Sequence, residues 1–296
     1  MSKPYIFLIA YNCGEIAKKC VETYLKHHSD TLHIFGTYKD FKKTGIYPSG
    51  VEYNELSGEV ELKENYKHGH MGTAYVFSKV ILEHSNSNHI IHIDSDIVFR
   101  QESISYLKEK LNEGYDIVGP RRCYKNNLNG RKDLSELRDV TQTYFFGFNK
   151  DKISAYDFNT LKMMVVGYQN PLKHPILDFF DPVAFDILKN GGKISYLDPD
   201  RFGCQFEDGS KKNKYTELNE YMDFGHNLMH FAGVGSGANF CSNGHLNIPE
   251  GYATWAKGRY ALYSSVFEDK NIVGVPYDVE KVKLIKTILE NDKHIL

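Results

Sequence analysis

The sequence predicts an α/β fold in which a mostly parallel sheet carries helices on both faces. In the first hundred residues, short apolar runs alternate with longer segments of helical periodicity, an order typical of parallel sheets with crossover helices. The run at 89–93 holds three isoleucines in five positions, which fits a central strand buried on both faces. The 296 residues are enough for one such domain with a substantial core.

Each expected element follows from its local pattern. Apolar runs predict strands at 5–10, 31–37, 51–56 and 89–93, and helical spacing predicts helices at 16–28 and 69–83. Farther along, the same criteria predict helices at 102–112, 150–156, 181–188 and 279–292, and strands at 116–118, 141–149 and 193–197. Asp181, which precedes Pro182, is expected to cap the helix that follows it. The polar segment 121–139 is interpreted either as a binding loop or as a solvated surface loop.

Composition narrows the functional classes. The formal net charge of −2 argues against nucleic-acid binding through a basic surface. The five cysteines form no C-x-x-C pair, which argues against a zinc site or a disulfide framework and favours a reducing compartment. The N-terminus lacks a signal-peptide pattern, and the apolar run at 5–11 is too short to span a bilayer. We expect a cytoplasmic protein with a single domain at 1–296, for which a homodimer is possible.

Two carboxylates follow the expected central strand, as Asp94-Ser95-Asp96. The carboxyl ends of strands are where open α/β sheets bind their ligands. In extended geometry Asp94 and Asp96 project to the same side, where their charges repel unless a cation lies between them. A hard divalent ion, Mg²⁺ or Mn²⁺, prefers such oxygen ligands. The other interpretation is a strand that ends in an ordinary turn, because Asp and Ser are turn formers.

A histidine near a glycine-rich segment is the second candidate site. His230 is followed by Gly233, Gly235 and Gly237 in alternate positions, with Ser236 between the last two. Glycines allow a backbone to approach a ligand closely, and successive N–H groups of such a turn can bind an anion. A neutral imidazole is a common metal ligand. We interpret His230 as a third metal ligand, although a lone histidine is more often a packed or surface residue.

Three segments resemble the GT-A glycosyltransferases, whose fold is Rossmann-like. His-Ile-Asp-Ser-Asp-Ile-Val at 92–98 resembles their Asp-x-Asp motif. The helix at 181–186, followed by Leu-Asp-Pro at 197–199, looks like the helix that begins with Asp-Gln-Asp in retaining family-8 enzymes such as glycogenin. His-Phe-Ala-Gly at 230–233 is similar to the His-Phe-x-Gly of that family. The chain departs from the family where Pro182 replaces the Gln and where 234–237 replaces a Lys-Pro-Trp.

The resemblance implies a metal-dependent hexosyltransferase that uses a nucleoside-diphosphate sugar, with a UDP-sugar as the expected donor. It implies an acceptor that is a glycan or another hydroxyl compound. The nucleotide-binding half would be 1–100, and the acceptor half with the C-terminal helix would be 101–296. The expected metal ligands for Mn²⁺ or Mg²⁺ are Asp94, Asp96 and His230. The expected nucleotide-sugar contacts are Ala10, Tyr11, Asn12, Asp94, Ser95, Gly233, Gly235 and Ser236.

The stereochemistry of transfer stays open at this stage. An inverting enzyme needs a general base, for which Asp181 or Asp178 is the best candidate. In a retaining enzyme, a carboxylate in that place would stabilise positive charge on the sugar ring.

Two other functional classes are also open. A sugar-1-phosphate nucleotidyltransferase would usually carry a glycine-rich loop with Arg and Lys after the first strand, whereas this chain has Tyr-Asn-Cys-Gly-Glu at 11–15. A non-catalytic sugar-binding relative would be expected to lose metal ligands.

Overall fold

The structure of the protein is a computed structural model. The described residues are 3–10, 13–36, 51–55, 85–123, 139–153, 180–207, 210–219, 222–243 and 250–292. The helix expected at 69–83 and the segment 124–138 of the expected loop lie outside them. No helix in the described part of the chain is long and apolar enough to cross a membrane.

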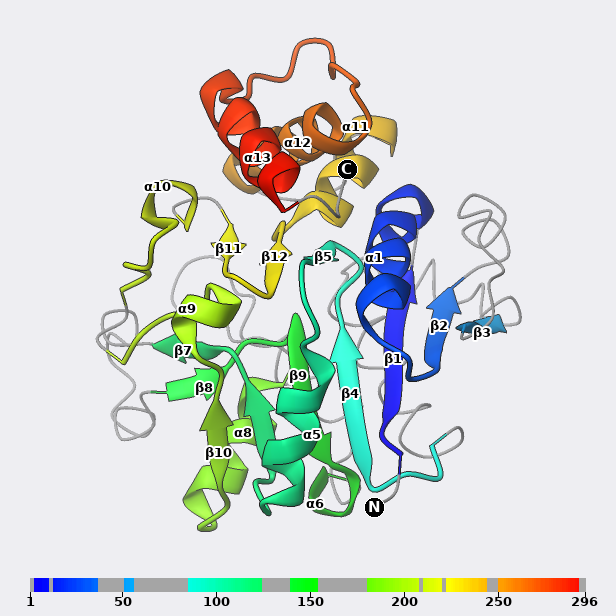
Figure 1. The fold of residues 1–296 in the computed structure, drawn as a ribbon, viewed down its shortest axis with the longest axis vertical. Helices are drawn as coiled ribbons and strands as arrows, with labels where there is room; N and C mark the ends of the chain where they lie inside the picture. The colour runs from blue at the N-terminus through cyan, green and yellow to red at the C-terminus, as the bar shows by residue number, and fades with distance from the viewer. Residues whose placement is uncertain are drawn as a thin grey trace.

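The centre of the fold is a seven-stranded sheet with the order β10-β6-β9-β4-β1-β2-β3 (Figure 1). Its strands are β1 (Tyr5–Ala10), β2 (Leu32–Gly36), β3 (Val51–Glu55), β4 (His89–Ile93), β6 (Ile117–Gly119), β9 (Phe145–Asn149) and β10 (Ile194–Tyr196). All neighbouring pairs are parallel except those of β9, which runs antiparallel to both β4 and β6. The predicted α/β fold with a mostly parallel sheet is therefore confirmed.

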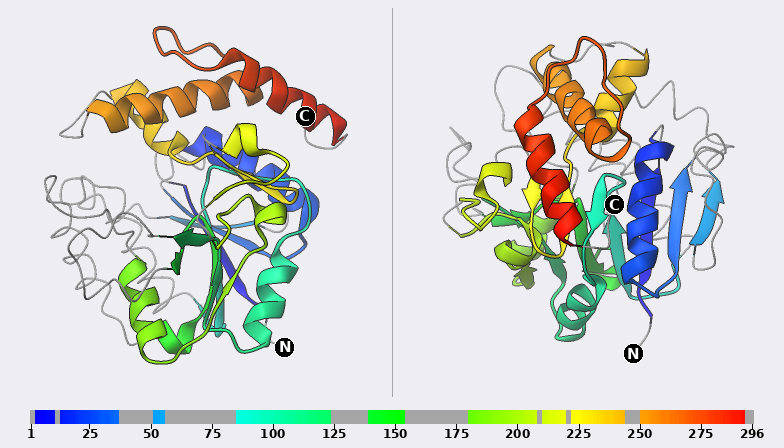
Figure 2. Two further views of the ribbon diagram at one scale, coloured as in Figure 1. Left: turned by 90° about the vertical axis from the view of Figure 1, so that its left-hand side faces the viewer. Right: turned by 45° about the horizontal axis from the view of Figure 1, so that its top comes forward.

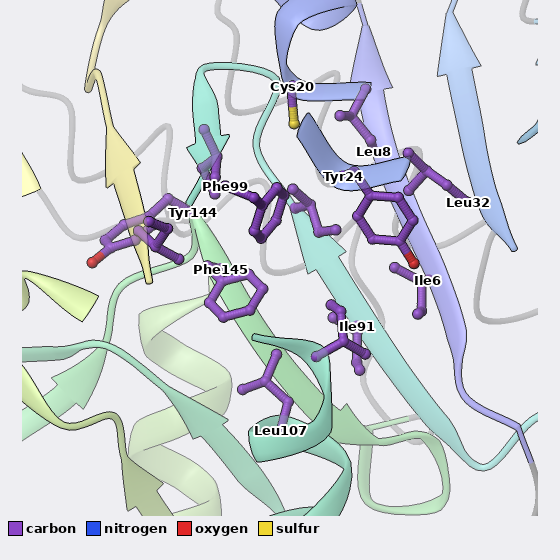
Figure 3. Close-up of a cluster of buried hydrophobic side chains, with 14 of the residues drawn as sticks. Ile6, Leu8, Cys20, Tyr24, Leu32, Ile91, Phe99, Leu107, Tyr144 and Phe145 are labelled. Carbon is purple, nitrogen blue, oxygen red and sulfur yellow. The ribbon is translucent and has the colours of Figure 1, made fainter. Parts of the chain in front are cut away.

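Helices cover both faces of this sheet. Figure 2 shows α5 (Ile104–Asn112) and α8 (Asp181–Lys189) on opposite sides of it. With α1 (Gly14–His27), α5 encloses a core that includes Ile91, Phe99 and Phe145, all of them fully buried (Figure 3). The remaining short helices are α6 (Lys150–Ile153), α9 (Pro199–Phe202) and α10 (Thr216–Asn219). The aromatic side chains of β9 thus serve the core, as the apolar sequence of this strand favours.

The helix α8 differs from the prediction at its first turn. Its N-cap is Phe180, without a side-chain capping hydrogen bond, and Asp181 is the first helical residue. Pro182 then follows in the first turn, where a missing backbone N–H is tolerated. The expectation that Asp181 caps the helix is therefore wrong by one position.

A second, three-stranded antiparallel sheet has the order β11-β12-β5. It joins β5 (Ile97–Phe99), which follows the Asp-x-Asp motif, to the hairpin of β11 (Asp223–Phe224) and β12 (Leu228–His230). Separately, β7 (Arg121–Cys123) pairs with β8 (Asp139–Thr141). Above the small sheet lie α11 (Val234–Asn243), α12 (Glu250–Phe267) and α13 (Val279–Asn291), at the top of Figure 1.

The two faces of the small sheet have different environments. Val98 and Met229 pack with residues of α12 and α13 in one hydrophobic cluster, whereas Phe99 and Leu228 belong to the cluster of the main sheet. Because strand side chains alternate between faces, His230 shares the face of Leu228. The small sheet therefore directs His230 toward the end of β4, where the Asp-x-Asp motif lies.

Candidate metal centre

Backbone pairing brings His230 to the Asp-x-Asp motif. Asp94 follows β4 directly, and its N–H donates to the carbonyl of Tyr144 over 2.7 Å. Ser95 and Asp96 form the turn from β4 into β5. The antiparallel pairing of β12 with β5 then sets His230 opposite Ile97, and Phe231 N–H donates to the carbonyl of Asp96 over 3.0 Å. The hairpin thus fixes the third predicted ligand beside the first two.

The three predicted ligands converge. One ligand atom from each of Asp94, Asp96 and His230 lies within 4.8 Å of the other two. Nε2 of His230 is 3.5 Å from Oδ1 of Asp96 and 4.0 Å from Oδ2 of Asp94. Asp96 and His230 are buried, whereas the Asp94 side chain is 39 % exposed. Two carboxylates and an imidazole with one exposed member form a donor set that fits a divalent metal with open positions toward solvent.

A buried carboxylate, absent from the sequence-based site, orients the imidazole. Asp223 lies opposite His230 in the β11–β12 pair, and its Oδ2 accepts a hydrogen bond of 2.8 Å from Nδ1 of His230. This leaves Nε2 to face Asp94 and Asp96. Asp223 also accepts from Nζ of Lys211. A carboxylate behind a metal-binding histidine fixes its tautomer and strengthens its basicity, so the triad has the support that a metal site requires.

The pKa values of these groups follow from their burial and contacts. Burial alone would raise the pKa of Asp223, but Lys211 and His230 together lower it to about 2. Burial raises the pKa of Asp96, and the opposing effect of His230 only partly offsets it. For His230, burial alone would lower the pKa, because it disfavours the charged imidazolium. Asp223 and Asp96 outweigh this effect and hold the pKa of His230 above its ordinary value. A bound cation would relieve the cost of burying these carboxylates.

Two aromatic rings complete the surroundings of the triad. The ring of Tyr144 stacks on the imidazole of His230, with centroids 3.9 Å apart and an angle of 16°. Figure 3 shows Tyr144 at the edge of the core cluster, with its hydroxyl directed away from that cluster. On β4, Nε2 of His92 is 3.6 Å from Oδ1 of Asp94, and its Nδ1 is 2.8 Å from the carbonyl of Thr143. These contacts restrict both His230 and Asp94 to a narrow range of orientations.

Comparisons with known proteins establish the fold. No protein-family model matches the chain, and no curated protein is significantly similar to it. The solved structure of the galactosyltransferase LgtC, in complex with donor and acceptor sugar analogs, matches with a TM-score of 0.51 at 9% identity and covers 84% of this chain and 99% of LgtC. The chain has the GT-A fold. The bifunctional glycosyltransferase WbbM matches with a TM-score of 0.50 at 12% identity, over 78% of this chain and 46% of WbbM.

The glycine-rich segment of this GT-A fold differs from the expected turn. Gly233 has a positive φ of 84°, and α11 begins directly afterwards at Val234. A side chain at Gly233 would overlap the ring of Trp255, and one at Gly237 would overlap the backbone of α12 at Ala256. Gly233 and Gly237 are thus required by helix geometry and close packing. The N–H groups of Gly235 and Ser236 belong to the first turn of a helix, which also favours anions.

Gly235 marks where the two expected parts of the nucleotide-sugar site meet. A Cβ at Gly235 would meet only Cβ of Cys13, at 3.8 Å. The Sγ of Cys13 in turn lies 3.2 Å from Oγ of Ser95. The chain after β1, the Asp-x-Asp turn and the start of α11 are therefore neighbours.

The other predicted site residues are described only in part. Ala10 is the buried last residue of β1. Tyr11, Asn12 and Asp178 lie outside the described residues, and for Asp181 only the backbone is described. Sequence reasoning missed Asp223, Lys211, His92 and Tyr144. Of these, His92 carried a signal, because it lies on β4 two positions before Asp94, so that in extended geometry the two side chains project to the same side.

Proposed function

We propose that this protein is a metal-dependent glycosyltransferase that moves a hexose from a nucleoside-diphosphate sugar, most simply a UDP-sugar, to a hydroxyl of a glycan or another acceptor. The observation that carries the proposal is the convergence of Asp94, Asp96 and His230 at the carboxyl end of β4 in a GT-A fold. This is the edge of an α/β sheet where ligands bind. The hydrogen bond from His230 to Asp223 supports a metal-binding rather than a purely structural histidine.

Asp94, Asp96 and His230 would hold the ion, Mn²⁺ or Mg²⁺. When bound, the ion would act as a Lewis acid toward the phosphate oxygens and as a template for the donor. Asp223 keeps the proton of His230 on Nδ1, so that Nε2 stays available as a ligand. The presence of all three ligands also argues against a non-catalytic relative.

The remaining residues bind and orient the donor in this proposal. The end of β1, with Ala10, Tyr11 and Asn12, would contact the base and ribose within a nucleotide-binding half at 1–100. Ser95, Gly233 and the first turn of α11, with Gly235 and Ser236, would lie along the diphosphate, since a helix N-terminus stabilises negative charge. Asp181 or Asp178, in the acceptor half at 101–296, would act on the sugar or on the acceptor hydroxyl.

The proposal is tested with a panel of nucleoside-diphosphate sugars. The protein is incubated with each donor and Mn²⁺ or Mg²⁺, and release of the nucleoside diphosphate is measured with and without a chelator. At least one donor should be hydrolysed slowly in a metal-dependent way, and the Asp96→Asn variant should lose this activity. Hydrolysis that continues unchanged in chelator, or in the Asp96→Asn variant, would contradict the metal-dependent mechanism.

A further inference from the structure

Helix α12 carries a buried arginine next to the candidate metal centre. Arg259 is 7% exposed. Its guanidinium Cζ lies 5.1 Å from the centroid of Trp255, one helical turn earlier. The ring of Trp255 in turn packs so closely on Gly233 that no side chain fits there. Gly233 is three positions after His230, so this turn of α12 lies on the segment that links the metal ligand to α11.

The charges around Arg259 belong to the same site. The acidic groups that act on it are Asp223 and Asp96, and burial lowers its pKa to about 10. Arg259 therefore remains charged at neutral pH despite the cost of burying a guanidinium. Trp255 is 39% exposed, so the pair extends from the buried acids to the surface of the protein.

Among the described charged groups of the centre, Arg259 decides whether the net charge with a bound ion is positive. Asp94, Asp96 and Asp223 contribute three negative charges, and Lys211 and Arg259 contribute two positive ones. A divalent ion turns this balance into one net positive charge. Without Arg259 the centre with its ion would be neutral, and the segment Val234–Asn243 beside it contains no Lys or Arg. Of the features described at this centre, the ion and the start of α11 would then be left to attract a diphosphate.

We propose that Arg259 binds the diphosphate of the nucleotide sugar and that Trp255 holds its guanidinium in place for this contact. A guanidinium matches phosphate oxygens with two parallel N–H donors, and the cation–π contact with Trp255 restricts its position. This inference rests on the proposed function, because it concerns the same metal centre. It goes beyond that function by assigning the charge that neutralises the diphosphate to a residue of α12.

The test uses Mn²⁺ alone and Mn²⁺ with inorganic pyrophosphate as probes, because neither requires the base or the sugar to be known. Binding is measured by electron paramagnetic resonance for Mn²⁺ and by calorimetry for pyrophosphate at saturating Mn²⁺. The variants are Arg259→Met and Arg259→Lys. Lys257→Met is the matched control, since it removes the same charge from the same helix at a half-buried position. Circular dichroism and thermal unfolding check that each variant is folded.

Arg259→Met should weaken pyrophosphate binding by about 10- to 100-fold, the effect of losing a hydrogen bond to a charged group. Its affinity for Mn²⁺ alone should be unchanged or higher, because a neighbouring positive charge is gone. Arg259→Lys should lose less affinity for pyrophosphate than Arg259→Met does. Lys257→Met should bind pyrophosphate as the wild type does. If Arg259→Met does not fold, a loss of at least threefold in Arg259→Lys supports the proposal, and wild-type affinity overturns it.

Two kinds of failure are distinguishable. Pyrophosphate binding at wild-type strength in a folded Arg259→Met variant would overturn the role of Arg259, because Arg259 would then only balance the buried acids. In that case the wild type still binds Mn²⁺, and the proposed function stands. A wild-type protein that binds neither Mn²⁺ nor Mn²⁺-pyrophosphate would overturn the proposed function itself, and the inference about Arg259 with it.

Discussion

Nδ1 of His230 lies 2.8 Å from Oδ2 of Asp223, across the antiparallel pair of β11 and β12. This contact places the imidazole proton on the nitrogen that faces away from Asp94 and Asp96. Asp223 is itself buried and paired with Lys211. The proposed metal ligand His230 is thus held by a chain of contacts that runs from Lys211 through Asp223.

Replacing Asp223 by Asn should therefore weaken metal binding without removing a ligand. The neutral amide accepts a weaker hydrogen bond from Nδ1 and can instead donate to it, which would favour the wrong tautomer. We expect the affinity for Mn²⁺ to fall by about 10- to 100-fold, as is usual for partners of metal-binding histidines. A Mn²⁺ titration followed by electron paramagnetic resonance measures this. Asp200→Asn, which changes an exposed acid on α9, is the control, and equal affinities in both variants would contradict the role of Asp223.

When no metal is bound, the ionised Asp96 side chain should lower the stability of the folded protein relative to an uncharged Asn at the same position. Burial raises the pKa of Asp96, which means that the folded protein holds the ionised carboxylate less well than the unfolded chain does. In Asp96→Asn, the thermal midpoint without metal should stay equal or rise, and the increase that Mn²⁺ gives to the wild type should disappear. A variant that is still stabilised by Mn²⁺ as strongly as the wild type would show that Asp96 is not a ligand.

Asp181 remains a predicted catalytic residue. The structure assigns the N-cap of α8 to Phe180, without a side-chain capping bond. We therefore expect Asp181→Asn to leave the thermal midpoint nearly unchanged. A catalytic carboxylate at this position predicts a fall in turnover of roughly 100-fold or more, the scale of acid–base contributions. Steady-state kinetics with the active donor decide the matter, and near-normal turnover would remove Asp181 from the catalytic site.

His28 should make stability depend on pH. It caps α1, its Nδ1 lies 2.9 Å from the carbonyl of Tyr24, and its Nε2 accepts from the N–H of Ser103 over 3.0 Å. Burial lowers its pKa from the ordinary 6.5 to about 4, although Tyr24 O, Glu102 and Asp30 act in the opposite sense. Since the unfolded chain binds the proton more tightly, stability is complete above pH 6.5 and falls as the pH drops toward 4, by about 3 kcal/mol at most.

The measurement for His28 is urea unfolding of the wild type and His28→Gln between pH 7 and pH 4.5. The Gln side chain can accept from the N–H of Ser103 but does not titrate. His28→Gln should be less stable than the wild type at pH 7, and the difference between their free energies of unfolding should narrow as the pH falls. Asp223, whose pKa is lowered to about 2 in the folded protein, begins to lose its stabilising effect below about pH 5, but it does so in both proteins and therefore cancels from the difference. Parallel pH curves for the two proteins would contradict the prediction.

The three proposed metal ligands could be named from the sequence because each carries a local signal. Asp94 and Asp96 follow an apolar strand, and His230 precedes glycines in alternate positions. Asp223 has no such signal, because it is a lone acid on a two-residue strand and reaches His230 only once the hairpin forms. Helix α12 was not predicted either. Polar Arg259 and Ser264 are buried in it, while Tyr252 and Trp255 are more than a third exposed, so its sequence lacks the apolar stripe of an ordinary surface helix.

The central claim is that Asp94, Asp96 and His230 bind one divalent metal ion. It is tested most directly by pulsed electron paramagnetic resonance of the Mn²⁺-loaded protein labelled with ¹⁵N-histidine. Direct bonding of a histidine nitrogen to Mn²⁺ gives a characteristic ¹⁵N coupling. We predict one bound Mn²⁺ with this coupling in the wild type, and loss of the coupling in His230→Gln. A wild-type spectrum without ¹⁵N coupling, or a coupling that persists in His230→Gln, would contradict the account.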